Sequence, residues 1–406
     1  TPLDHVVALE AARDVLLDAV RPVETEPLPL ADCAGRVLAE DVAAAENVPP
    51  FDRSPYDGYA LRSADTAAAT RENPVTLYII EEVPAGAVPT KECTQNTAVK
   101  ILTGAPIPAG ADAVINFERT EFTPSTVKLF APIARGENIV RAGEDVRKGD
   151  VLLRQGQVID PGAAGTLAAQ GVAHPKVYRR PRVGVLSTGN EVVEVEAARA
   201  AGKIYNSNRY TLSAALEGLG CEPVYLGLAR DDPEAVRELL ERGLAECDAV
   251  VSTGGVSVGD YDFTPDAMER AGVNILFRGV QLKPGMACAY GEKDGKPVCG
   301  LSGNPASSLT NFLVVAAPAL KKMAGRAEYL PREISVTLKS DFPKKSRATR
   351  LLRGTLDLSD GTVGMRLSAD QGNVVISSAI GCDVMAIVPA GSGALRAGTT
   401  LKGFLL

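Results

Sequence analysis

The chain has 406 residues, of which 45% are hydrophobic and 23% charged, so two to four domains with ordinary cores are expected. Its formal net charge of −7 excludes a global basic field that would favour nucleic acid. No apolar run reaches the roughly 18 residues of a membrane span, and the first residues lack the order of a signal peptide. We therefore expect a cytoplasmic protein that binds neither nucleic acid nor membrane.

Cysteine and histidine narrow the possible chemistry. The seven cysteines include no C-x-x-C pair and leave an odd count, which predicts reduced, mostly buried thiols and neither a disulfide framework nor a zinc site. The only histidines are His5 and His174, and His174 lies in a short stretch between segments, where a surface position is expected. Catalysis must therefore rely on carboxylates, lysines, hydroxyls and backbone amides.

The first 178 residues show three changes of pattern. Apolar residues recur at helical spacing over 4–20, which predicts a helix, and residues 28–42 form a short extended link. From about 46 to 142, short strand-like pieces broken by Pro and Gly predict a mostly β domain. Residues 143–178 return to turns and a helix over 161–170. This pattern predicts a discontinuous domain of residues 1–45 and 143–178, interrupted by a β-rich domain of residues 46–142.

From Arg179 short apolar runs alternate with helical stretches. The runs cover 183–186, 249–252 and 298–301, and the helices 209–219 and 233–246. Such alternation predicts a parallel sheet covered on both faces, over residues 179–326. Strand-like pieces then come at 334–338, 351–358 and 362–367, with a hairpin signal at Asp360-Gly361. They predict a small all-β domain over residues 327–406.

Three glycine-rich turns follow strands of the α/β domain, where parallel sheets bind ligands. They cover residues 187–191, 252–262 and 301–307, and Pro305 suits the first position of a helix. One such turn alone is more often only a tight turn. Three on one sheet edge favour backbone amides that hold phosphate or another oxyanion. The Lys283-Pro284-Gly285 turn adds a cation to the same domain.

The same edge also carries the acids Glu191, Asp231 and Asp262. Asp232 precedes Pro233 and is interpreted as a helix cap, which leaves Asp231 free for another task. Two like charges about 4 Å apart repel by roughly 4 kcal/mol at an effective dielectric of about 20, so acids beside an oxyanion require a cation. Mg²⁺ suits carboxylates shared with phosphate oxygens. The sequence therefore predicts a magnesium site with ligands among these three acids.

Residues 253–262, Thr-Gly-Gly-Val-Ser-Val-Gly-Asp-Tyr-Asp, resemble the molybdopterin-binding signature shared by molybdopterin adenylyltransferases and molybdenumtransferases. Residues 49–60 resemble a molybdenumtransferase segment with a Met-Asp-Gly-Tyr-Ala core, in which Tyr56 takes the Met position. Segments 102–106, 143–145 and 283–285 also match that family, in its order along the chain. The chain is therefore identified as a member of the molybdopterin molybdenumtransferase (MoeA) family, which is related to the gephyrin E domain.

This resemblance implies a multidomain α/β plus β fold. Its parts are a MogA-like α/β/α domain with a parallel-rich sheet, a lemon-shaped β-rich domain, a discontinuous central domain and a C-terminal β-barrel. A homodimer is implied, in which Asp57 of one subunit approaches the α/β domain of the other. The residues linked to activity are Asp57, Thr103, Asp145, Glu191, Asp231 and Asp262. Ligand contacts are expected at Thr253, Gly254, Gly255, Ser257, Gly259, Lys283, Ser302, Gly303, Asn304, Pro305, Ser307 and Ser377.

The implied reaction is Mg²⁺-dependent insertion of molybdate into adenylylated molybdopterin with release of AMP, without a nucleophilic side chain. The alternatives are a molybdopterin adenylyltransferase and a non-catalytic, gephyrin-like scaffold. A molybdopterin adenylyltransferase and recipient molybdoenzymes are the implied partners. The residues leave three questions open: whether the metal is molybdenum or tungsten, which of Arg347, Arg350 and Arg353 contacts molybdate, and how Ser302 acts at a position where the family commonly has proline.

Overall fold

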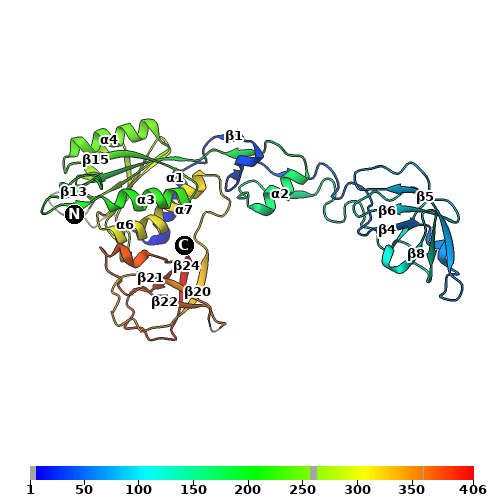
Figure 1. Ribbon diagram of the computed structural model, residues 1–406. Helices are drawn as coiled ribbons and strands as arrows, with labels where there is room; N and C mark the ends of the chain where they lie inside the picture. The colour runs from blue at the N-terminus through cyan, green and yellow to red at the C-terminus, as the bar shows by residue number, and fades with distance from the viewer. Residues whose placement is uncertain (1–5, 257–262, 360) are drawn as a thin grey trace. The chain divides into compact units, whose positions relative to one another are not determined.

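The computed structural model describes residues 6–256, 263–359 and 361–406. The chain divides into two compact units, the first with residues 1–40, 155–161 and 174–406 and the second with residues 41–154 and 162–173. Figure 1 draws both and labels some of their helices and strands. In the described ranges, no helix combines the length and the apolar character that crossing a lipid bilayer requires.

The main sheet of the first unit has six strands in the order β15-β12-β16-β19-β18-β17. The first four strands run parallel, whereas β18 and β17 are antiparallel to their neighbours. The predicted parallel-rich sheet is therefore confirmed. Its strands are β12 (Arg182–Thr188), β15 (Glu222–Ala229), β16 (Ala249–Thr253), β17 (Asn274–Arg278), β18 (Cys288–Lys293) and β19 (Lys296–Leu301).

Successive strand residues pack on opposite faces of this sheet, as the pleat requires. Val251 belongs to a core shared with the helices α1, α3 and α7, whereas Val250 belongs to a second core with α4 and α5. Both faces are therefore covered, and Figure 1 shows α4 on one side and α3 and α6 on the other. The helices are α1 (Leu9–Ala19), α3 (Ser207–Gly218), α4 (Pro233–Glu246), α5 (Thr264–Arg270), α6 (Pro305–Asn311) and α7 (Ala317–Met323), with a π-helical turn, η4 (Phe312–Ala316), joining the last two.

The predicted N-terminal helix starts later than its apolar spacing suggested. It begins at Leu9, because Val7 is extended and pairs with Val280 through the bonds Val7 N–H to Gly279 O and Gln281 N–H to Val7 O, 3.2 and 2.8 Å. Backbone pairing with a distant segment thus replaces the first helical turn. Short elements of this unit are β1 (Thr25–Pro27), η1 (Leu30–Asp32), β2 (Val37–Leu38), β11 (Lys176–Tyr178), β13 (Val192–Val193) and β14 (Ile204–Tyr205).

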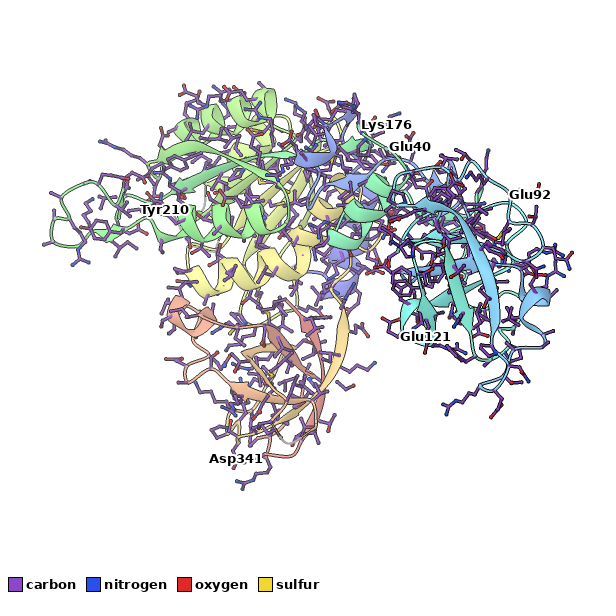
Figure 2. The ribbon with its side chains drawn as sticks, turned by 45° about the vertical axis from the view of Figure 1, so that its right-hand side comes forward. Glu40, Glu92, Glu121, Lys176, Tyr210 and Asp341 are labelled. Carbon is purple, nitrogen blue, oxygen red and sulfur yellow. The ribbon has the colours of Figure 1, made fainter. Side chains whose placement is uncertain are left out.

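The C-terminal strands close into a barrel in the order β20-β22-β21-β23-β24. The predicted hairpin is confirmed as the antiparallel pair β21 and β22, although Asp360 lies outside the described residues. In Figure 2, Asp341 marks the end of the barrel that faces away from the α/β sheet. The elements are β20 (Glu333–Leu338), β21 (Arg350–Asp357), β22 (Gly364–Leu367), η5 (Ile376–Ala379), β23 (Val384–Val388) and β24 (Thr400–Leu405).

The second unit is built on a six-stranded sheet in the order β7-β4-β6-β5-β9-β8. Tyr59 and Ala60 are both fully buried because the two faces of β4 pack into different apolar clusters. The predicted β-rich domain is thus present. Its elements are β3 (Val42–Ala43), β4 (Gly58–Leu61), η2 (Ser63–Thr66), β5 (Val75–Val83), β6 (Thr97–Ile101), β7 (Ala113–Asn116), η3 (Phe117–Arg119), β8 (Thr120–Phe122), β9 (Thr126–Leu129), β10 (Val151–Leu153) and α2 (Pro161–Ala169).

The cysteines and His174 occupy the environments that their sequence contexts predict. All seven thiols are unpaired, and six are buried, with Cys382 partly exposed. His174 is exposed. The multidomain α/β plus β fold class is therefore confirmed, while the residue numbers given for the domain boundaries stay a prediction.

Candidate active site

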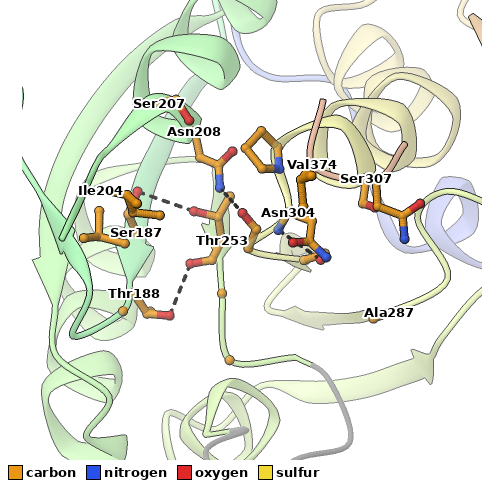
Figure 3. Close-up of a pocket in the computed structure, with 18 of the residues that line it drawn as sticks. Ser187, Thr188, Ile204, Ser207, Asn208, Thr253, Ala287, Asn304, Ser307 and Val374 are labelled. Carbon is orange, nitrogen blue, oxygen red and sulfur yellow. Dashed lines mark hydrogen bonds between the residues drawn. The ribbon is translucent and has the colours of Figure 1, made fainter. Parts of the chain in front are cut away.

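A pocket of about 820 Å³ opens where β12, β16 and β19 end, in the first unit. Because these strands run parallel, the turns that come after them meet at one edge of the sheet. Figure 3 shows Thr188 and Thr253 from two of these strand ends, opposite Asn304 and Ser307 of the third turn and α6. The barrel contributes Asn373 and Val374 to the same wall.

The pocket brings together most of the residues predicted for ligand binding. They are Glu191, Asp231, Thr253, Gly254, Gly255, Lys283, Ser302, Gly303, Asn304, Pro305 and Ser307. Ser257, Gly259 and Asp262 lie outside the described residues. Ser377 lies elsewhere, in a separate hollow of about 340 Å³ beside η5 of the barrel. Asp57, Thr103 and Asp145 belong to the second unit.

Asp231 and Asp232 divide their tasks as the sequence predicts. Asp232 caps α4 by accepting bonds from the N–H groups of Glu234 and Ala235, 3.3 and 3.4 Å. Asp231 faces the pocket, where its Oδ2 accepts a bond from the Asn190 N–H at 3.1 Å. One carboxylate therefore stabilises the helix while the other is held at the pocket wall.

Carboxylate oxygens are the ligands that Mg²⁺ prefers. Glu191 and Asp231 line the same pocket, and Glu191 is exposed to solvent there. Within the described ranges no group of three His, Cys, Asp or Glu side chains is close enough to hold a metal ion by itself. Two of the three predicted magnesium ligands thus share the pocket and fit the ion chemically, and the third, Asp262, lies outside the described residues.

The glycine turn after β16 approaches β12 very closely. Gly254 has a φ of +96°, and a Cβ there would lie 2.4 Å from Thr188 Oγ1, so only glycine fits. Its N–H donates to Leu301 O at 2.9 Å, and the Ser307 N–H donates to Asn373 O at 3.2 Å. These two amides are therefore committed to partners within the protein.

Ser302 gains a local role from its hydroxyl. Its Oγ accepts a bond from the N–H of Asn304, the residue directly before α6, at 3.2 Å. Pro305 occupies the first turn of that helix, as predicted. Ser302 thus stabilises the approach to α6 by a hydrogen bond, where a proline would do so by fixing the backbone.

The Lys283 turn is held at both ends. Its backbone pairs with the barrel through Lys283 N–H to Thr349 O and Leu351 N–H to Lys283 O, each 2.9 Å. The buried Asn311 donates Nδ2–H to Gly285 O at 2.6 Å and accepts the Tyr290 hydroxyl at 2.5 Å. Burial raises the pKa of Tyr290 well above its ordinary value, so the phenol remains a donor. The Lys283 side chain is left exposed at the pocket.

The three candidate arginines differ sharply. Arg347 is exposed. Arg350 is 8% exposed and donates Nε–H to Ser346 Oγ at 3.1 Å, and Arg353 is 1% exposed and bound to Ser378 Oγ and Gly372 O. None of them is among the described residues that line the pocket. Arg353 therefore has a structural role, which joins β21 to the 371–378 segment.

In the second unit, the segments that resemble the family converge on one another. Asp57 Oδ1 accepts the N–H and the hydroxyl of Thr103 at 2.7 and 2.8 Å, bonds that lower the pKa of Asp57. Asp145 donates its N–H to Val48 O at 3.0 Å, and its side chain is exposed. Segments 49–60, 102–106 and 143–145, far apart in sequence, are therefore brought together.

Sequence reasoning missed several residues of this region. Asn311 and Tyr290 lie inside apolar stretches, and no motif or residue spacing in the sequence singled them out as part of a site. Asn208 lines the pocket from α3 and donates Nδ2–H to Gly303 O at 2.9 Å. Asn206, at the N-terminus of α3, and Glu194 were missed as well. Their only signal was the polar stretch before α3, which is also typical of an ordinary helix start.

Comparison with known proteins agrees with this architecture. Residues 7–171 match the family described as the MoeA N-terminal region (domain I and II), and residues 184–322 match the family described as a probable molybdopterin binding domain. The chain is similar to the molybdopterin molybdenumtransferases of Staphylococcus aureus strain Mu50 (39% identity, 90% of this chain and 87% of the relative) and Staphylococcus epidermidis strain ATCC 35984 (35%, 93% and 90%).

A solved structure is similar over nearly the whole chain. It is the molybdopterin biosynthesis MoeA protein from Pyrococcus horikoshii, with 33% identity, a TM-score of 0.85, and coverage of 98% of this chain and 99% of that one. The resemblance seen in the separate motifs thus extends to the full sequence and the fold. The chain belongs to the molybdopterin molybdenumtransferase family, transferases of molybdenum cofactor biosynthesis.

Proposed function

We propose that this chain inserts molybdate into adenylylated molybdopterin with release of AMP, in a Mg²⁺-dependent reaction. One observation carries the proposal: a single pocket presents the carboxylates of Glu191 and Asp231 together with the Lys283 cation. Carboxylates suit Mg²⁺ and an ammonium suits an oxyanion, so one pocket can hold an adenylylated ligand and molybdate at once. The two Staphylococcus relatives support the same reaction, because both are named molybdopterin molybdenumtransferase and the similarity covers 90% and 93% of this chain.

The proposed roles follow from the chemistry of each group. Glu191 and Asp231, with Asp262, would hold Mg²⁺, which neutralises charge on phosphate oxygens and eases departure of AMP. Lys283 holds molybdate beside the pocket wall while the ligand's dithiolene sulfurs replace its oxo groups. Hydroxyls and side-chain amides of the strand ends orient the ligand, so the protein contributes positioning and electrostatics.

A covalent enzyme intermediate is not required. The buried thiols on β18 and β19 are poor nucleophiles, since burial raises the pKa of Cys288 to about 12 and that of Cys299 further still. The hydroxyls of Thr253 and Ser187 are committed to hydrogen bonds. The reaction therefore needs no side-chain nucleophile: the oxo groups replaced by sulfur leave molybdate as water, and a water molecule forms the new bond to phosphorus that releases AMP.

AMP release from adenylylated molybdopterin tests this function, with molybdate and tungstate compared side by side. Oxyanion-dependent AMP release is expected, and the two oxyanions together identify the preferred metal. Formation of adenylylated molybdopterin from molybdopterin and Mg-ATP without molybdate would indicate an adenylyltransferase instead. Binding of both ligands without turnover would indicate a scaffold.

We also propose that the chain works as a cytoplasmic homodimer, in which Asp57, Thr103 and Asp145 of one subunit serve the pocket of the other. Seven unpaired cysteines suit a reducing compartment. If the site is shared, a subunit-exchanged mixture of the inactive Asp57→Asn and Asp231→Asn variants should regain about a quarter of wild-type AMP release, because half the dimers contain one intact site. No recovery would reject the shared site.

Ser377 is proposed to contact ligand from the barrel. Its Ala variant tests this contact through the dependence of the rate of AMP release on molybdate concentration.

A further inference from the structure

A chain of side-chain hydrogen bonds runs from the pocket to a carboxylate outside it. Ser187 and Thr253 are register partners on β12 and β16, and each is 2% exposed at the pocket floor. The Thr253 hydroxyl donates to Ser187 Oγ at 3.4 Å, which Figure 3 draws, and Ser187 donates to Asn206 Oδ1 at 3.0 Å. Asn206 Nδ2–H donates to Glu194 Oε1 at 3.1 Å. Four side chains thus form one directed series.

The direction of this series is fixed by its outer end. Asn206 Oδ1 caps α3 by accepting the Arg209 N–H at 3.2 Å, while its Nδ2 faces the Glu194 carboxylate. A backbone N–H can only donate and a carboxylate can only accept, so the Asn206 amide has one possible orientation. Ser187 must therefore donate to Asn206, and Thr253 must donate to Ser187. The remaining valences of the Thr253 oxygen are lone pairs.

Glu194 is firmly held as an anion. Its Oε2 accepts Arg209 Nη1–H at 2.8 Å, its Oε1 also accepts the Tyr225 hydroxyl, and the Arg209 guanidinium lies 3.9 Å above the Tyr225 ring. Burial alone would raise the pKa of Glu194, but the bonds from Tyr225, Arg209 and Asn206 outweigh it and lower the pKa. Glu194 is not among the described residues that line the pocket, but its partner Asn206 is, so the bond to Asn206 connects Glu194 to the pocket.

We propose that Glu194 is a positioning residue that gives the pocket floor acceptor character at Thr253 and selects a ligand heterocycle presenting an exocyclic amino group there. The inference rests on the proposed function, in which adenine and pterin each carry such an amino group. Phosphate oxygens are themselves acceptors and would gain nothing from Thr253, so the phosphates bind elsewhere in the pocket. The shared chemistry is a heteroaromatic amine, and the choice between the two rings is left to the experiment.

Glu194→Gln removes the fixed direction of the series. The amide oxygen of the introduced glutamine stays beside the Arg209 cation, so its NH₂ faces Asn206 Nδ2, and two donors then meet. Turning the Asn206 amide over would relieve this clash only by setting Nδ2 against the Arg209 N–H that Asn206 caps, so neither orientation holds Ser187 and Thr253 in one donor order, and the Thr253 hydrogen can turn to the ligand. Calorimetry compares AMP with inosine monophosphate, and pterin with lumazine, since each pair exchanges an amino group for an oxo group. For the ring that occupies the floor, wild type should prefer the amino form by about tenfold, and Glu194→Gln should abolish or invert that preference.

Two further variants keep the test decisive. Thr253→Val removes the acceptor and should abolish the same preference. Tyr225→Phe removes one bond to Glu194 but leaves an ionised acceptor, so the affinity ratio should remain that of wild type. A wild-type protein without a preference in either pair overturns the inference, as does a Glu194→Gln variant that lowers both affinities of a pair equally. AMP release by the wild-type protein is measured in parallel, and its absence rejects the proposed function. If AMP is released but Glu194→Gln keeps the wild-type ratio of amino to oxo affinities, only this inference is rejected.

Discussion

Replacing Asn311 with leucine removes the two hydrogen bonds that hold the Lys283 turn against α6. Asn311 is 1% exposed, and it bridges the buried Tyr290 phenol, at 2.5 Å, and the Gly285 carbonyl, at 2.6 Å. Leucine fills a similar volume without pairing with either group. A buried polar group left unpaired costs about 1–3 kcal/mol, so two of them predict a loss of about 2–6 kcal/mol in the free energy of unfolding.

A double-mutant cycle separates this bridge from a general packing defect. Tyr290→Phe alone leaves only Asn311 Oδ1 unpaired, at a cost of about 1–3 kcal/mol, and the double variant leaves only Gly285 O unpaired. The double variant should therefore be more stable than the sum of the two single effects predicts. The chain lacks tryptophan, so urea unfolding is followed by far-ultraviolet circular dichroism. Strictly additive effects, or an Asn311→Leu loss below about 0.5 kcal/mol, would refute the bridge.

The same variant should also change the use of molybdate. A loosened turn displaces the Lys283 ammonium, so the molybdate concentration for half-maximal AMP release should rise while that for adenylylated molybdopterin stays near the wild-type value. Equal changes in both would indicate a general disturbance of the pocket and would contradict a specific role for the turn.

Three other changes test separate parts of the molecule. Asp231→Asn should abolish AMP release and leave the urea midpoint unchanged, and full activity at low Mg²⁺ would contradict the metal assignment. Asp232→Ala should cost about 1 kcal/mol of stability through loss of the α4 cap, whereas Asp232→Asn should retain it. Burial raises the pKa of Asp248, but bonds from Arg179 at 2.6 and 2.7 Å and from the Arg182 N–H lower it overall. Ionised Asp248 therefore stabilises the fold above the pKa that this carboxyl has in the unfolded chain, and the stabilisation is lost as pH falls through its pKa in the folded protein. The difference in free energy of unfolding between wild type and Asp248→Asn should therefore shrink as pH falls from about 5 to about 2. A difference that stays constant over this range would refute the assignment.

Local sequence signals correctly predicted the elements whose pattern of apolar and capping residues matches their burial in the fold. The helix over 233–246 was predicted to the residue, because Asp232 and Pro233 mark its start and its apolar face repeats at helical spacing. Strands β12, β16 and β19 were predicted in the same way, since buried parallel strands are short apolar runs. Knowing that these strands are parallel was enough to bring their glycine-rich turns to one pocket.

Other features depend on contacts that no local pattern encodes. The start of α1 is decided by backbone pairing between Val7 and Val280, far apart in sequence. Asn311 and Tyr290 lie in stretches that are typical of apolar cores, and only their pairing shows that they support a turn. The amide of Gly254, expected to face a ligand, is committed to Leu301 because the two strands approach closely. Sequence spacing therefore located the pocket but not the partners of its groups.

The barrel contributes residues to the pocket wall and also supports the turn that carries Lys283. The Lys283 turn exchanges two backbone hydrogen bonds with Thr349 and Leu351 at the start of β21, and Asn373 O accepts the Ser307 N–H of α6. Leu351 also belongs to the apolar core beneath the α/β sheet. Buried backbone groups need partners, so the Lys283 turn has a defined position only when β21 is folded beside it. The barrel therefore fixes the position of the turn that carries Lys283, the lysine proposed to bind the oxyanion, so residues beyond the α/β domain contribute to this pocket.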